Sequence, residues 1–278
     1  MIKKFKMLGI FSLLLLFVSL SFNGCAKFSA ELGKVNESAN LGTNNTTPPA
    51  VPPTVVPAPP GFPVGLAFTE TANVNLADQR RITATVTAQK GFNGSLRVAI
   101  DRTLLNTFDP AQNIVITPSE VSIILVEGES KSQEFLVTTR SMANSGTGQF
   151  KFVVTPTSGI YTGQIIGNAV VIVNALYQIN LSGPPNGNLM VWSSPPPGAT
   201  VDFSPHVGGV TIRYVNIDPL VVHRVHIAPG KYHEPTNLGV NGQIYDIRVT
   251  ETAVNFPVSY HCHIHAAADR RLRFNVAQ

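Results

Sequence analysis

The sequence predicts an all-β protein built from two β-sandwich domains. Apolar and polar residues alternate with a period of two in many short runs, such as Ile82–Thr87 and Val210–Asn216. Turn dipeptides such as Asn93-Gly94 and Asn241-Gly242 separate these runs. No helical stretch is predicted between residues 64 and 175, and the spacing of the short strands is typical of antiparallel sandwiches.

Residues 1–24 have the pattern of an export signal. Three lysines near the start precede the apolar run Met7–Phe22, which is shorter than the about 20 residues that a membrane-spanning helix needs. The junction Phe22-Asn23-Gly24-Cys25 resembles a bacterial lipobox, which implies a lipidated Cys25 and a membrane-tethered chain. Ala26 resembles the residue that follows the cysteine in outer-membrane lipoproteins. Ordinary signal cleavage and an uncleaved anchor are the alternatives.

Residues 25–63 are predicted to be a disordered linker, rich in Pro, Asn and Thr, that acts as a stalk. The formal net charge of the chain is +4, but Lys3, Lys4 and Lys6 supply three of these charges. The remaining residues are therefore close to neutral, which argues against nucleic acid as a partner.

Residues 64–175 are predicted to form the first sandwich. The run "ITPSEVSIILVEGESKSQEFLVTT" loosely resembles immunoglobulin-like modules of bacterial surface proteins. This segment contains no histidine and no cysteine, so metal or nucleophile chemistry is not expected in it. We interpret it as a spacer or an interaction module.

Residues 176–278 form the second predicted domain, and the residues that carry chemistry lie in it. All seven histidines fall between His206 and His265. The segment 260–265 places the thiol of Cys262 among three imidazoles. In an exported chain Cys262 has no disulfide partner, because Cys25 is lipidated or lies beyond the linker. A metal would occupy this thiolate, and thiolate with imidazole suits copper or zinc. The alternative is a buried structural thiol beside surface histidines.

Two segments of this domain resemble the cupredoxin family. They are "VTIRYVNIDPLVVHRVHI", at residues 210–227, and the late "HCHIH", at residues 261–265. The likeness is greatest to the plastocyanin-like C-terminal domain of multicopper oxidases. It implies a Greek-key barrel that binds copper through His223, Cys262 and His265. It also implies one-electron transfer with a redox partner protein, or copper handling, on the periplasmic or cell-surface side of the outer membrane.

The multicopper oxidase pattern further implies a possible second metal at His226, His261 and His263. The next oxidase ligand would stand at Ala228, and a complete three-copper cluster needs more imidazoles than the seven in this chain. The axial methionine is also missing, since Arg270 or Leu272 occupies its place. A copper oxidoreductase using the second metal, and a structural surface lipoprotein with a vestigial site, are therefore the alternatives.

No catalytic residue is assigned from the sequence. His206 and His233 fit no motif and are interpreted as loop histidines. The sequence does not indicate an oligomeric state.

Overall fold

The structure is a computed structural model, and it describes residues 52–158, 160–182, 191–192, 201–204, 206–223, 225–228, 232–233, 239, 242–249, 256–262 and 270–276. The predicted signal peptide, Cys25 and the linker up to residue 51 lie outside the described residues.

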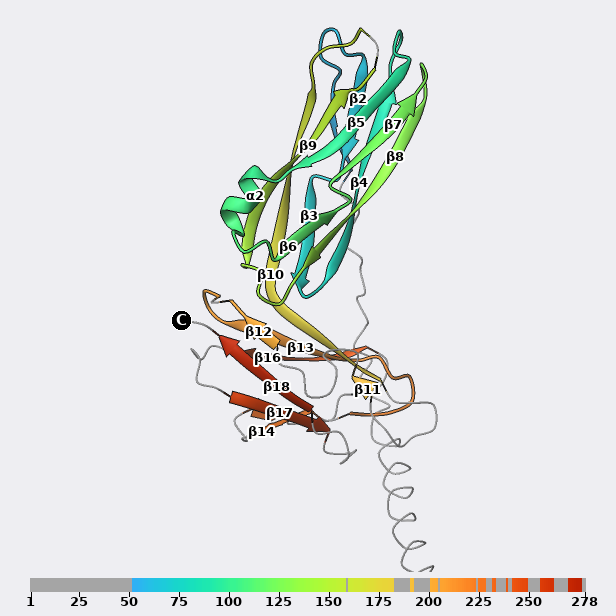
Figure 1. Ribbon diagram of the computed structural model, residues 1–278. Coiled ribbons are helices and arrows are strands. Elements are labelled where there is room, and N and C mark those ends of the chain that lie inside the picture. The colour runs from blue at the N-terminus through green and yellow to red at the C-terminus, as the bar shows by residue number, and fades with distance from the viewer. Residues whose placement is uncertain are drawn as a thin grey trace, which may run out of the picture. The chain divides into compact units, whose positions relative to one another are not determined.

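The described residues form three β-sheets, so the predicted all-β class is confirmed (Figure 1). The first sheet has the order β1 (Thr54–Val56), β2 (Val64–Phe68), β4 (Gln79–Ala88), β8 (Ser130–Thr139) and β6 (Ile114–Thr117). The second has the order β16 (Gln243–Val249), β13 (Val210–Asn216), β10 (Ile165–Ser182), β9 (Gly146–Pro156), β5 (Gly94–Asp101) and β7 (Glu120–Leu125), and β3 (Thr71–Leu76) and β11 (Val191–Trp192) pair with β10. The third has the order β12 (Val201–Phe203), β18 (Arg270–Val276), β17 (Phe256–Cys262), β14 (Val225–Ala228) and β15 (Tyr232–His233).

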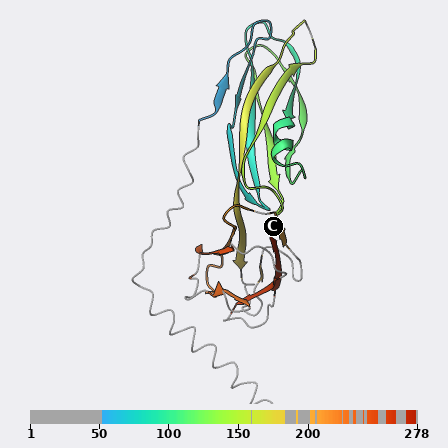
Figure 2. The ribbon, with the colours of Figure 1, turned by 90° about the vertical axis from the view of Figure 1, so that its left-hand side faces the viewer.

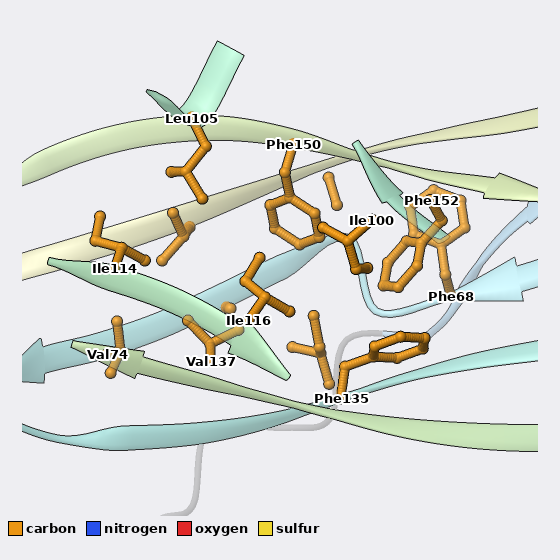
Figure 3. Packing of buried hydrophobic residues seen from close by; sticks show 14 of the residues in the cluster. Phe68, Val74, Ile100, Leu105, Ile114, Ile116, Phe135, Val137, Phe150 and Phe152 are labelled. Carbon is orange, nitrogen blue, oxygen red and sulfur yellow. The ribbon is translucent and has the colours of Figure 1, made fainter. Parts of the chain in front are cut away.

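Aromatic side chains from two sheets meet in the core of the sandwich (Figure 3). Phe68 of β2 and Phe135 of β8 come from the first sheet, while Phe150 and Phe152 are on β9 of the second. The Phe152 ring centroid lies 5.4 Å from that of Phe68 and 5.5 Å from those of Phe135 and Phe150. All four rings are at most 2% exposed, so the alternating pattern of these strands buries one face of each sheet.

A short helix, α2 (Thr103–Phe108), interrupts the region in which no helical stretch was predicted. Asp101 stands before the helix and accepts hydrogen bonds from the Thr103 hydroxyl and the Thr103 N–H. These bonds lower the pKa of Asp101 below its usual value, the hydroxyl bond contributing most. Leu105 is fully buried, and a Cβ at Gly148 would lie 2.7 Å from atoms of Leu105 and Phe108. The helix therefore packs on β9 at a position where only glycine leaves room.

The folded part begins before residue 64, where the predicted linker ended. Residues Thr54–Val56 form β1, which pairs antiparallel with β2, and Phe62 is fully buried. The β-branched residues Val55 and Val56 favour an extended chain. An edge strand also tolerates neighbouring prolines, because its outer N–H groups need no partner in the sheet.

Strand β10 runs through residues 175–176, the predicted boundary between the two domains (Figures 1 and 2). Its first part pairs antiparallel with β9 and parallel with β3. Its last part, Leu176–Leu181, pairs parallel with β13. The first sandwich is thus joined to the histidine-bearing region by one continuous strand, with a register shift between Asn174 and Tyr177.

Candidate metal centre

The third sheet holds the predicted thiolate ligand at a defined register. Strands β14 and β17 are antiparallel neighbours, with Val225 opposite Cys262 and His226 opposite His261. Residues directly opposite in such a ladder share one face of the sheet, and successive residues alternate between faces. Cys262 therefore shares a face with Val225, while His226 and His261 share the other face.

The register separates the third sheet into two faces of different composition. The face with Cys262 carries mostly apolar residues and one arginine, namely Val225, Ile227, Tyr232, Phe256, Val258, Tyr260, Arg270, Leu272 and Phe274. The opposite face carries His226, Ala228, His233, Pro257, Ser259, His261, Arg271 and Arg273. Val225 is 1% exposed, so the face that carries Cys262 is the core face at this position.

The loop after β13 is held by the side chain of Asn216, which is fully buried. Its amide nitrogen donates to the Val221 carbonyl at 2.8 Å and to the Gly239 carbonyl at 2.9 Å. Its amide oxygen accepts from the Asp218 N–H at 3.0 Å. Asn216 thus ties the start of the loop to Val221, two residues before the predicted ligand His223.

Asp218 continues this loop network toward His223. One carboxylate oxygen, Oδ1, accepts from the N–H groups of Leu220 and Val221 at 2.9 and 3.0 Å. The other oxygen, Oδ2, lies 3.9 Å from Nε2 of His223. The His223 side chain is 1% exposed and the Asp218 side chain 7% exposed. The loop therefore presents a buried imidazole whose Nε2 faces a carboxylate.

The residue types His and Cys suit copper in their chemistry. His223 is buried two residues before Val225, and Cys262 is directly opposite Val225. A thiolate and imidazoles are ligands that copper accepts, and a carboxylate near the far nitrogen of a ligating imidazole orients that imidazole. His265, the third predicted ligand, lies outside the described residues.

The predicted second metal set is only partly placed. His226 and His261 are opposite each other on β14 and β17, whereas His263 lies outside the described residues. His233, which sequence reasoning left outside every motif, is directly opposite His226 on β15. The sequence does indicate this pairing: the turn dipeptide Pro229-Gly230 lies midway between His226 and His233.

His206 lies in the loop between β12 and β13, as the sequence indicated, and it is buried there. It is 8% exposed, and its Nδ1 lies 2.8 Å from the Ser145 hydroxyl. Among the described residues, its Nε2 has no hydrogen-bond partner. Burial lowers the pKa of His206 below its usual value of 6.5, because desolvation penalises the imidazolium. Ser204 also donates to the Met142 carbonyl, so this segment is bonded to the loop that follows β8.

Three further findings apply to the described part of the chain alone. Among the residues whose side chains the structure describes, no three of His, Cys, Asp or Glu lie close enough to hold a metal ion, and His226, His233 and His261 are not among these residues. Of the predicted ligands, only His223 has a described side chain. No helix among the described residues is long and apolar enough to cross a membrane.

The sequence matches no protein-family model and no curated protein. Among solved structures, a protein of unknown function from Porphyromonas gingivalis W83 is similar over 78% of this chain and 100% of its own, with 12% identity and a TM-score of 0.28. The E. coli chaperone DraB is similar over 77% of this chain and 96% of its own, with 10% identity and a TM-score of 0.25. The complex of zinc 2-glycoprotein and prolactin-inducible protein from human seminal plasma contains a chain that is similar over 39% of this one and 93% of its own, with 11% identity and a TM-score of 0.26. No functional conclusion follows from likeness at this level.

Proposed function

We propose that this chain is a membrane-tethered, extracytoplasmic copper protein whose C-terminal cupredoxin-like region binds copper through His223, Cys262 and His265. Copper held by a thiolate and imidazoles carries single electrons. One-electron exchange with a redox partner protein, or copper handling, is the proposed role. The lipid anchor at Cys25 would keep the site at the periplasmic or cell-surface side of an outer membrane.

The observation that carries this proposal is the register of Cys262 opposite Val225. Cys262 is paired with Val225, which is 1% exposed and lies two residues after the buried His223. The network of Asn216 and Asp218 supports the proposal further, because it holds the loop that carries His223.

The proposal is tested by copper loading of the full-length chain. One Cu²⁺ per chain with an intense visible absorption from a thiolate–copper bond is expected. His223→Ala, Cys262→Ala and His265→Ala should each abolish this absorption. The matched control is His206→Asn, which removes an imidazole but keeps a hydrogen-bonding side chain opposite Ser145.

Each outcome of this experiment decides between functions. Absorption that survives in Cys262→Ala contradicts the thiolate site. Copper that binds without colour favours copper handling over electron transfer. A chain that binds no copper favours the structural alternative, a surface lipoprotein with a vestigial site.

A second candidate function is a copper oxidoreductase that uses another metal at His226, His261 and His263. The direct pairing of His226 with His261 favours it, because two imidazoles then share one face of the sheet. Two coppers per chain and steady oxygen consumption with electron donors are expected from it. Loss of the second copper in the His261→Ala, His263→Ala double variant would support this function over simple electron transfer.

A further inference from the structure

Three histidines occupy the same register position on three neighbouring strands of the third sheet. His226 on β14 is opposite His233 on β15, and the same His226 is opposite His261 on β17. The strand order β17-β14-β15 makes His226 the middle residue. We call His233, His226 and His261 the histidine row. His226 and His233 lie on the successive strands β14 and β15, and His261 comes from the later strand β17.

All three residues of the histidine row share one face of the sheet. Pairing directly opposite puts them on the same face, since side chains in a sheet alternate along each strand and match across strands. Cys262 is the next residue after His261 and is opposite Val225, so it belongs to the other face. The histidine row is therefore separated from the proposed thiolate site by the sheet itself.

The spacing of the row suits a single metal ion. Directly opposite residues have Cβ atoms about 4.5–5.5 Å apart, so each outer histidine is about one strand spacing from the middle one. The length of an imidazole side chain plus a Zn–N bond of about 2.0–2.1 Å is enough to span the distance between neighbouring strands. The register thus places the three histidine positions within a span that one metal ion can bridge. Three imidazoles also leave one position of a tetrahedral ion open.

We propose that the histidine row is a second metal site, which binds Zn²⁺ through His226, His233 and His261 and leaves its fourth position to water or a small anion. The site is independent of the proposed copper function, because it uses no residue of the thiolate face. It also differs from the oxidase-like set, in which His263 takes the place of His233. Arg271 and Arg273 share this face of the sheet, and their positive charges favour an anion at the open fourth position of the ion.

The test uses the full-length Cys262→Ala chain, in which the thiolate site is removed, and the probe is Zn²⁺ alone. One Zn²⁺ per chain is expected by equilibrium dialysis. Adding His233→Ala removes a proposed ligand and should weaken Zn²⁺ binding at least about 100-fold. This loss exceeds the 10–100-fold that is typical when a residue hydrogen-bonded to a ligand is removed. The matched control is Tyr232→Phe, which alters the neighbouring residue of β15 and removes no imidazole. His263→Ala tests the oxidase-like set and should leave the affinity unchanged.

A second measurement needs no substitution in the row. In the Cys262→Ala chain, Zn²⁺ should protect His226, His233 and His261 from chemical modification of their imidazoles, as read residue by residue by mass spectrometry. His263 should stay reactive. No Zn²⁺ binding by the Cys262→Ala chain, protection of His263 in place of His233, or unchanged affinity in His233→Ala would each overturn the proposal. Failure of the thiolate copper site would not affect these readouts, so the two proposals fail separately.

Discussion

Asp218 Oδ2 lies 3.9 Å from Nε2 of His223, and both side chains are buried. The other oxygen of the same carboxylate accepts two backbone N–H groups of the loop. One residue therefore both shapes the turn and sets the electrostatic surroundings of the imidazole. The carboxylate thus places a negative charge beside a buried imidazole, where water screens it little.

The first prediction concerns Asp218→Asn in the copper-loaded chain. The Asn oxygen can still accept the N–H groups of Leu220 and Val221, so the fold and the visible absorption should persist. Loss of the negative charge should destabilise the more positive oxidised centre, and the reduction potential should rise on the order of tens of millivolts. Spectroelectrochemistry measures the potential. An unchanged potential with an intact absorption would show that Asp218 has only a structural role.

The second prediction concerns Asn216→Ala. The substitution leaves the carbonyls of Val221 and Gly239 and the N–H of Asp218 without the partner they now have. Because Asn216 is fully buried, the free energy of unfolding should fall by about 2–3 kcal/mol. Urea denaturation of the metal-free chain measures it. Asn216→Asp should cost at least as much, because its carboxylate would face two carbonyl oxygens; a neutral effect of both variants would contradict the network.

The alternation of apolar and polar residues predicts many of the strands. The elements that it misses are missed for physical reasons. Val210–Asn216 alternates strictly and forms β13 as predicted, since one face of the strand is buried. The helix α2 was missed because Leu104 and Leu105 fit a short strand as well as a helical turn. The helical turn is distinguished from a strand by the packing of Leu105 against Gly148, which is a tertiary contact. Strand β1 was missed because the surrounding prolines have the composition of a linker.

The sequence alone predicts which residue types could bind a metal in the candidate site and how they are spaced along the chain. The dense group around Cys262 marks metal chemistry in the sequence alone. The opposition of His233 and His226 is a property of strand register, which a single sequence specifies only through the Pro229-Gly230 turn signal. The approach of Asp218 to His223 depends on the path of a loop, and local sequence patterns do not determine it.

The third prediction concerns Phe152→Ala in the sandwich core. Phe152 is fully buried and contacts the rings of Phe68, Phe135 and Phe150. The cavity and the lost ring contacts should lower the free energy of unfolding by about 3–5 kcal/mol. Urea denaturation measures this change, with the fully exposed Val207→Ala as the control that should have no effect. Equal losses in both variants would contradict the assigned core.

The last prediction concerns the pH dependence of stability through His206. Its pKa in the folded chain is lowered by burial, so the unfolded chain binds a proton at a higher pH than the folded chain does. The contribution to stability is therefore constant above the unfolded pKa of 6.5 and is lost as the pH falls from that value through the lower folded pKa.

His206→Asn removes this titration and keeps a hydrogen-bonding group opposite Ser145. Thermal midpoints of the metal-free wild-type and variant chains should be compared between about pH 8 and pH 5. The wild-type chain should lose more stability than the variant below the unfolded pKa, while their difference stays constant above it. Other histidines titrate in both chains and cancel in the difference. Parallel curves across the whole range would mean that the His206 imidazole is solvated in the folded protein, against its 8% exposure and its contact with Ser145.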